Sequence, residues 1–270
     1  MNHLMKSTLL FCVLSLSVFT INAQETTQAL SESQKKGLQI AKEIKAKNTG
    51  WVSSSSNMVM TLRTKKGREL ERLMTNKALE VNNDGDKGLT VFNTPADVRG
   101  TAFLSFSHIE DADDQWIYLP ALKRVKRIAS RNKSGPFLGS EFAFEDLSSF
   151  EVEKNTYDYL GDESINGLDA YKVEMRPLDK YSGYTRTVAW VDKEHYRIHK
   201  IEFYDRRDTH LKTLTQEGFK LYLDKFWRSD KQYMVNHKTG KSTDIEIKDL
   251  VFGTDVDESA FNENRLRNAR

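Results

Sequence analysis

Apolar and polar positions along this 270-residue chain follow two periods, and the first of them is helical. Residues 31–47 place Leu38, Ala41 and Ile44 on one side of a helix, while lysines and glutamates fill the other side. A serine at the start can cap the segment, and Asn48 stands where it ends. The sequence therefore predicts an amphipathic helix near the amino end of the chain.

Beyond this helix, apolar positions mostly alternate with polar ones, which is the period of a β-strand. Tyr171, Val173 and Met175, for example, alternate with charged residues. The dipeptide Asn166-Gly167 separates two such segments and is a strong signal for a two-residue hairpin turn. The predicted strands, about a dozen at hairpin spacing, are residues 58–63, 70–74, 89–92, 101–106, 115–119, 157–165, 168–175, 184–191, 196–204, 211–221, 232–237 and 242–250.

Strands with one apolar and one charged face predict a large antiparallel sheet or barrel with a dry side that must be covered. One amphipathic helix is too small to cover a sheet of this size. Two arrangements remain open: the sheet closes around its own side chains, or its concave side holds something apolar. Few prolines and the lack of a Ser/Gly-rich linker indicate a single domain over residues 24–270.

The first residues have the pattern of a secretory signal peptide. An apolar run from Leu9 to Phe19 follows Lys6, and Ala23 stands at the expected cleavage position. Cys12, the only cysteine, lies in this run without the small preceding residue of a lipoprotein signal. We therefore expect residues 1–23 to be removed, leaving a periplasmic chain without disulfides or cysteine-based metal sites.

Charge and motifs exclude several classes of function. The chain has 41 Lys and Arg against 39 Asp and Glu, a balance that argues against a dedicated nucleic-acid protein. It contains no HExxH, G-x-S-x-G or P-loop motif. The acidic residues 110–114 lack the glycine and distal glutamate of a calcium loop, and His195 and His199 would lie about 13 Å apart in one strand. We predict no catalytic residue, no cofactor and no metal.

A basic run follows directly on the apolar strand at residues 115–119. Lys123, Arg124, Lys126 and Arg127 belong to it, and no aromatic residue is interleaved among them as nucleic-acid binding would favour. Two interpretations stay open. The run either receives anionic lipid head groups or an acidic partner, or it is a solvated edge hairpin whose charges discourage aggregation.

The segment after the basic run places Phe137 and Leu138 between two glycines, with Phe142 close behind. Glycines around an apolar tip suit a flap that covers a hydrophobic opening. The same residues suit an ordinary plug in a core. The sequence leaves both open.

The stretch "DDQWIYLPALKRVKRIASRNKSGPFLGSEFAFEDL", with "DVRGTAFLSF", "INGLDAYKVEMRP", "WVDKEHYRIHKIEFYD" and "FNENRL", resembles the outer membrane lipoprotein-sorting protein family. These proteins are similar to the periplasmic lipoprotein carrier LolA and its receptor LolB. The resemblance implies an unclosed antiparallel β-barrel of about eleven strands with helices covering the concave side. It also implies a non-enzymatic protein whose interior shields acyl chains, in a branch often associated with export permeases of the resistance-nodulation-division (RND) type.

These observations together predict a monomeric periplasmic carrier. It would bind the acyl chains of a lipoprotein or lipid and pass its cargo toward an outer-membrane acceptor or an exporter. The alternative is an accessory protein of an RND-type permease, with no bound lipid and an interior filled by its own side chains. The residues predicted to line the cavity are Met58, Met60, Leu62, Phe103, Trp116, Tyr118, Phe137, Leu138, Phe142 and Trp190.

Overall fold

The computed structural model describes residues 29–269. The predicted signal peptide, residues 1–23, and Cys12 lie outside this range.

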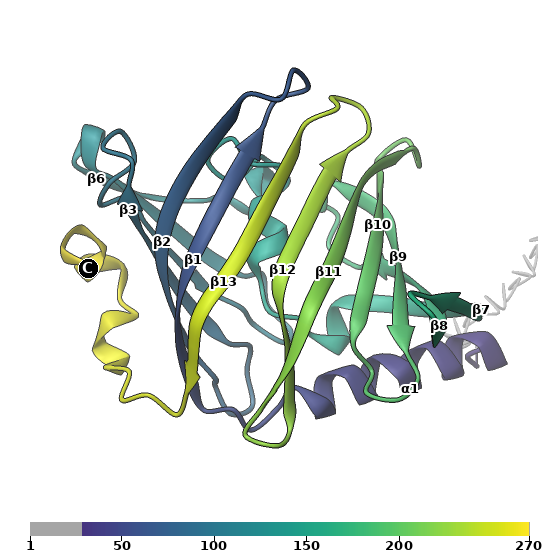
Figure 1. The fold of residues 1–270 in the computed structure, drawn as a ribbon. Helices are drawn as coiled ribbons and strands as arrows, with labels where there is room; N and C mark the ends of the chain where they lie inside the picture. The colour runs from purple at the N-terminus through teal and green to yellow at the C-terminus, as the bar shows by residue number, and fades with distance from the viewer. Residues whose placement is uncertain (1–28, 270) are drawn as a thin grey trace, which may run out of the picture.

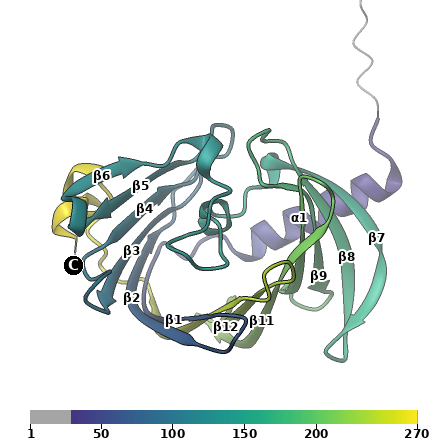
Figure 2. The same ribbon diagram turned by 90° about the horizontal axis from the view of Figure 1, so that it is seen from above.

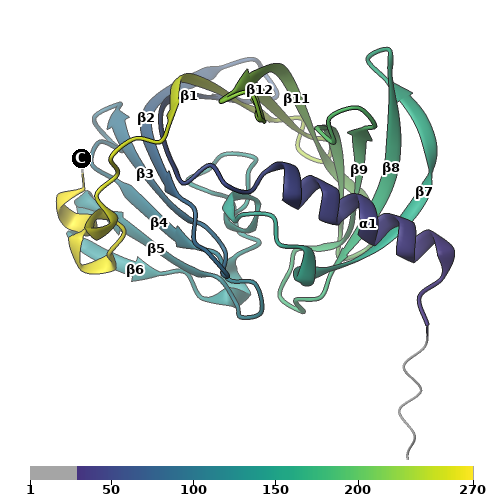
Figure 3. The ribbon, with the colours of Figure 1, turned by 90° about the horizontal axis from the view of Figure 1, so that it is seen from below.

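Helix α1 (Glu32–Lys47) confirms the amphipathic helix predicted at the amino end. Ser31 and Gln34 form a capping box at its start, so two otherwise free backbone N–H groups are bonded. Its buried face packs on the edge strand β7 (Asn155–Ile165). Gly37 permits this close approach, because a β-carbon there would lie 3.0 Å from backbone nitrogens of β7. The helix crosses one end of the barrel (Figure 3).

Thirteen strands form one antiparallel sheet. They are β1 (Ser53–Arg63), β2 (Glu69–Leu79), β3 (Lys87–Thr94), β4 (Ala102–Phe106), β5 (Asp114–Leu119), β6 (Arg124–Arg127), β7, β8 (Leu168–Pro177), β9 (Tyr184–Asp192), β10 (Ile198–Asp205), β11 (His210–Tyr222), β12 (Phe226–Asn236) and β13 (Ser242–Phe252). The spatial order is β6-β5-β4-β3-β2-β1-β13-β12-β11-β10-β9-β8-β7. The sheet curls strongly (Figure 1), and β6 and β7 remain as separate edges of an unclosed barrel (Figure 2).

The mainly β architecture matches the prediction, and the strand number needs correction. The resemblance implied about eleven strands, whereas the structure has thirteen. The additional strand relative to the alternating pattern is β6, which is formed by the basic run itself. The predicted hairpin at Asn166-Gly167 is confirmed: both residues have positive φ, 53° and 78°, as a type I′ turn requires.

The resemblance implied several helices over the concave side, and this expectation was wrong. Among residues 29–269 the concave side is covered by one α-helix and by the long connection from β6 to β7, which carries only short 3-10 turns. These turns are η2 (Ser130–Asn132), η3 (Phe144–Leu147) and η4 (Val152–Lys154). In Figure 2 the connection, coloured teal, lies inside the curled sheet. Part of the interior is therefore occupied by a loop.

The carboxyl-terminal segment covers part of the convex face. Its 3-10 turns η5 (Glu258–Ala260) and η6 (Glu263–Asn268) place Phe261 and Leu266 against strands β3 to β5. The segment lies outside the barrel in Figure 1, where it is yellow. Strands β4 and β5 are consequently buried on both faces, which has consequences for the predicted cavity residues.

Candidate functional site in the barrel interior

One part of the interior is filled by residues 135–147, which we call the plug. Phe137 is 2 % exposed, and its ring centroid lies 5.8 Å from Phe92, 5.1 Å from Phe103 and 5.6 Å from Phe144. These rings meet in tilted and edge-to-face geometry, which aromatic pairs prefer. Phe142 is 3 % exposed in the same cluster. The aromatic tip predicted as flap or plug fills the core in this structure.

A tight turn gives the plug its shape. Leu138 and Gly139 both adopt left-handed backbone angles, with φ of 48° and 81°. The Phe137 N–H donates to the Phe142 carbonyl over 2.7 Å and closes the turn. Gly139 explains why a glycine follows the Phe-Leu pair, because glycine adopts positive φ without strain. The leucine tip is thereby held inside the barrel.

Buried charges anchor the plug to the strands. Lys212 on β11 pairs with Asp146 over 2.6 Å, and its ammonium also donates to the Glu141 carbonyl over 3.0 Å. The Tyr184 hydroxyl donates to the other oxygen of Asp146 over 2.8 Å. Burial and the neighbouring carboxylates raise the pKa of Tyr184 well above its usual value, so the phenol stays protonated and keeps donating. The plug is thus fixed by polar contacts as well as by packing.

Arg72 of β2 is a second cation that reaches the plug. It is 7 % exposed, and its Nη1 donates to the Leu138 carbonyl over 2.7 Å. Its Nε has no partner among the described residues. Burial lowers the pKa of Arg72, and Asp97 opposes the shift only through space. Arg72 is therefore a buried guanidinium bound mainly by one backbone carbonyl of the plug.

Most of the residues predicted to line a cavity do lie in the interior. Met60 and Phe103 belong to the concave core, and Met58 and Leu62 pack against it. The plug residues Phe137, Leu138 and Phe142 lie in the same cluster. A ligand-binding role for these residues stays a prediction.

Three predicted residues face elsewhere, and their assignment to the interior was wrong. Trp116 and Tyr118 lie on the convex face of β5, in the cluster formed with the carboxyl-terminal segment. Trp190 faces away from its neighbours Ala189 and Val191, which pack with α1. Its indole N–H donates to a Glu163 oxygen over 2.7 Å, and lysine side chains cover its ring. A one-residue difference in facing reverses such assignments.

The other part of the interior is hollow. A cavity of about 720 Å³ lies between α1, the turn after β9 and strands β10 to β13, and a neighbouring cavity of about 330 Å³ reaches β1 and β2. The two share lining residues at α1, β10 and β12. We call the pair the helix cavity. Its apolar lining includes Ile44, Ile198, Phe219, Trp227, Ile247 and Phe252.

Ionisable groups are also enclosed beside the helix cavity. Burial raises the pKa of Asp86 to about 6, although Lys45 nearby favours the charged form. Arg228 lines both parts of the cavity, and burial lowers its pKa while Asp86 and Glu80 oppose the shift. Lys45 pairs with Glu151 over 2.8 Å. The lining of the cavity is therefore amphipathic: apolar side chains stand beside polar and charged ones, such as Gln216 and Gln232, and an ionic group lies at the junction of its two parts.

Sequence reasoning missed the helix cavity because no local pattern marks it. The walls come from α1 and from strands far away in the chain, so the space exists only once the helix is placed. Trp227 also fell outside the predicted strand at 232–237, whereas β12 begins at Phe226. The aromatic pair at residues 226–227 could have indicated the earlier start of this strand, because aromatic residues are frequent in strands.

The basic run forms a solvent-exposed edge. Lys123 follows the 3-10 turn η1 (Pro120–Leu122), and all four residues of β6 are exposed. Arg127 pairs with Asp114, which is also 3.5 Å from a His108 nitrogen. The other three cations have no carboxylate partner within residues 29–269. The four positive side chains therefore form an accessible basic edge.

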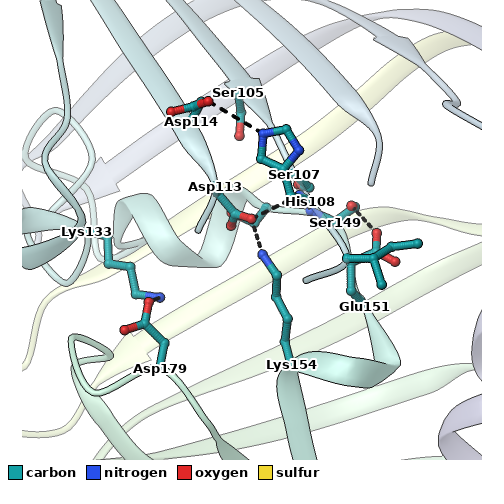
Figure 4. Close-up of polar contacts among 12 residues, drawn as sticks. Ser105, Ser107, His108, Asp113, Asp114, Lys133, Ser149, Glu151, Lys154 and Asp179 are labelled. Atoms are coloured by element: carbon teal, nitrogen blue, oxygen red, sulfur yellow. Dashed lines mark hydrogen bonds and ion pairs between the residues drawn. The ribbon is translucent and has the colours of Figure 1, made fainter. Parts of the chain in front are cut away.

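The acidic turn at residues 110–114 is tied to cations of its surroundings. Asp113 pairs with Lys154 beyond the plug, and the Asp114 carboxylate lies 3.5 Å from His108 (Figure 4). On its other nitrogen, His108 lies 2.8 Å from the Asp84 carboxylate. Within residues 29–269, no three His, Cys, Asp or Glu side chains gather as metal ligands do. Helices long and apolar enough to cross a bilayer are likewise absent from that range.

Comparison with known proteins places the chain in a family. A family model described as "Uncharacterized protein" matches residues 84–268. No curated protein matches the chain. A solved structure from Vibrio parahaemolyticus, described as an outer membrane lipoprotein-sorting protein domain, shares 57% identity over 87% of this chain and 99% of its own, with a TM-score of 0.85.

Two further structures share the fold. A DUF1329 family protein from Desulfovibrio piger has 28% identity over 87% of this chain and 100% of its own, with a TM-score of 0.82. A LolA superfamily protein from Nitrosomonas europaea has 22% identity over 87% of this chain and 99% of its own, with a TM-score of 0.66. With the fold, the quoted motifs and the identity to the Vibrio domain in agreement, the chain belongs to the outer membrane lipoprotein-sorting protein family.

Proposed function

We propose that this protein is a periplasmic, non-enzymatic carrier that holds the acyl chains of a lipoprotein or lipid in the helix cavity. The observation that carries the proposal is the size and lining of that cavity. Its larger part, about 720 Å³, falls in the range of small-ligand pockets, and both parts combine apolar side chains with polar and charged ones, as an amphiphile requires. Family membership supports the same function.

Burial of methylene groups would supply the affinity. Each buried methylene contributes roughly 0.8 kcal/mol, so a long chain binds tightly without any polar contact. Release then needs a change in the walls, which a membrane or a receptor would supply. Helix α1 is the wall best placed to move. It packs on the edge strand β7, and within residues 29–269 only its carboxyl end leads into a strand, β1.

The plug changes which of the predicted lining residues could contact a cargo. Met58 pairs with Ile247 across β1 and β13, and Ile247 lines the helix cavity. Met58 is therefore the predicted residue nearest to the proposed cargo. Met60, Leu62 and Phe103 would contact cargo only if the plug left the interior.

A second candidate function is an accessory protein of an RND-type exporter that binds no lipid. Two observations favour it: the plug fills part of the interior with the protein's own side chains, and the basic edge at β6 is accessible. Under this proposal, the protein docks through Lys123, Arg124, Lys126 and Arg127. An outer-membrane acceptor is expected as a partner only if the protein is a carrier, and not if it is an accessory protein.

Native mass spectrometry of the mature protein from its own periplasm tests the carrier proposal. A stoichiometric co-purifying lipid or acylated peptide is expected. Ile247→Trp should fill the cavity and remove this mass, whereas Val251→Trp on the exposed part of β13 should keep it. A protein that is free of lipid and takes up no added fatty acid would overturn the carrier and favour the accessory protein.

A further inference from the structure

We infer that the helix cavity binds an anionic amphiphile, and that Arg228 binds its carboxylate or phosphate oxygens. The inference rests on the proposed carrier function and specifies the chemistry of its cargo. Arg228 extends from β12 to the junction of the two parts of the cavity.

Most donors of Arg228 remain free. A guanidinium has five N–H donors. Nη1 donates to Asn48 Oδ1 over 2.6 Å and to the Trp227 carbonyl over 2.9 Å. Within residues 29–269, Nε and Nη2 have no hydrogen-bond partner, and no carboxylate lies within 4.0 Å of the guanidinium. Neither nitrogen is enclosed by protein, so both are accessible to a ligand in the cavity.

The surroundings of Arg228 disfavour an uncompensated charge. The Phe226 and Phe252 rings lie 5.7 and 5.4 Å from the guanidinium carbon and compensate its charge only in part, through cation–π contacts. Burial lowers its pKa, which means that the charged form loses hydration there. Asp86 and Glu80 favour the charged form only through space, and Asp86 is itself partly protonated near pH 6 because it is buried. An oxyanion of the cargo would complete the pairing with two parallel hydrogen bonds, the geometry that arginine favours.

Among the other cations around the cavity, Lys47 is solvent-exposed, and the rest are already engaged. Arg197 pairs with Asp192 over 2.8 Å, and Lys225 donates to the Thr49 carbonyl over 2.7 Å. Arg228 is thus the cavity cation with free donors and a buried setting. An acidic head group on Arg228 would leave the acyl chain to extend along the wall that contains Ile198 and Ile247.

A purely structural role for Arg228 is the competing explanation. Its bond to Asn48, the C-cap of α1, would then serve only to hold the helix end. That role predicts a loss of stability when Arg228 is replaced, and no change in the preference among ligands. Ligand preference separates the two explanations.

The test compares dodecanoate, dodecyl phosphate and dodecanol as competitors of a neutral fluorescent probe bound to the mature chain. Wild-type protein should bind the two anions at least about tenfold more tightly than the alcohol, as charge-assisted hydrogen bonds require. Arg228→Gln should abolish this preference while keeping the affinity for dodecanol, and Arg228→Lys should keep part of it. Lys42→Gln removes a charge from the exposed face of α1 and should change nothing.

The outcomes are distinct. If none of the three compounds binds, the carrier function itself is overturned. If all three bind equally and Arg228→Gln alters only the melting temperature, the carrier stands and the anion site is overturned. A preference for dodecyl phosphate over dodecanoate would assign the site to a phospholipid head group, and the reverse order would assign it to a free fatty acid.

Discussion

Lys212 and Asp146 form an ion pair of 2.6 Å in which the two side chains are only 4% and 6% exposed. Lys212 belongs to β11 and Asp146 to the plug, so the pair joins the sheet to the loop inside it. Asp146 also accepts from the Ala143 N–H over 2.7 Å and orders the turn η3. The charge of each partner is compensated only while the plug is seated.

Asp146→Asn should therefore destabilise the protein by about 3–5 kcal/mol, because it leaves Lys212 as a buried, uncompensated charge. Urea denaturation measures this difference. Tyr184→Phe removes a neighbouring hydrogen bond and should cost only about 1 kcal/mol. A cost below that of Tyr184→Phe would contradict the role of the pair in seating the plug.

Replacement of Arg72 by Met should have a different effect. The substitution removes a buried charge with one carbonyl partner, so stability should change by less than about 1.5 kcal/mol in either direction. The plug loses its bond to the Leu138 carbonyl, and amide hydrogen exchange of residues 138–141 should accelerate. Arg99→Met, on an exposed arginine outside the interior, is the control. Unchanged exchange in the plug would show that packing alone holds it.

The alternating pattern predicted the strands well where one face is solvated. The β8 segment at residues 168–175 is an example. Its charged side chains do not belong to the apolar core, so the alternating apolar ones, such as Val173 and Met175, can face only inward. The pattern failed where both faces are buried. Phe103 and Leu104 on β4 are 3% and 0% exposed on opposite faces, so their apolar character carries no information about facing.

The interior was harder to predict, since long-range packing determines it. The glycines around Phe137 and Leu138 indicated an unusual turn, yet the direction of that turn depends on Arg72 and Lys212, which lie far away in the chain. Trp116 and Tyr118 were assigned inward because nothing local indicated that the last residues of the chain cover them. The helix cavity likewise depends on the position of α1 relative to distant strands.

Leu266→Ala tests how much the carboxyl-terminal segment stabilises the sheet. Leu266 is fully buried against the convex side of β3 to β5, so truncation should cost about 2–5 kcal/mol. Val256→Ala, in the same segment but only partly buried, should cost less. Equal and small losses in denaturant unfolding would mean that the segment detaches without affecting the sheet.

Asp86 should make stability depend on pH. Its pKa is raised by burial to about 6, above the ordinary value of 3.8, so the folded state binds this proton more tightly than the unfolded state. Its contribution is therefore most favourable below about pH 4 and is lost as the pH rises through 6. The loss is on the order of 1–3 kcal/mol. The raised pKa already includes the opposing effect of Lys45 and the reinforcing effects of Glu151 and Glu80.

Asp86→Asn should remove this dependence. The variant should gain stability relative to wild type at pH 7.5 and not at pH 4.5, as measured by denaturant unfolding at both values. Asp97→Asn is the control for a general charge effect. A gain of equal size at both pH values would contradict a raised pKa at Asp86.

Reversal of the basic edge tests whether it binds an anionic surface. All four basic residues are exposed: Lys123, Arg124, Lys126 and Arg127. Changing them to Glu should therefore leave the melting temperature nearly unchanged. The only ion pair lost among the described residues, that of Arg127 with Asp114, is a surface pair that stabilises by at most about 1 kcal/mol. If the edge binds lipid head groups, each cation contributes roughly 1 kcal/mol at an anionic surface. Binding to phosphatidylglycerol vesicles should then fall at least about a hundredfold, and wild-type binding should weaken as salt rises.

A matched reversal at the β1–β2 and β12–β13 hairpin tips separates this effect from net charge. Lys65, Lys66, Arg68 and Lys238 are exposed at two hairpin tips, and their change to Glu alters the net charge equally. This variant should keep most of the vesicle binding if the β6 edge is the contact surface. Equal losses of vesicle binding in both variants would indicate a general charge effect. No loss of vesicle binding in either variant would identify the basic edge as a solvated strand whose charges prevent pairing with other chains.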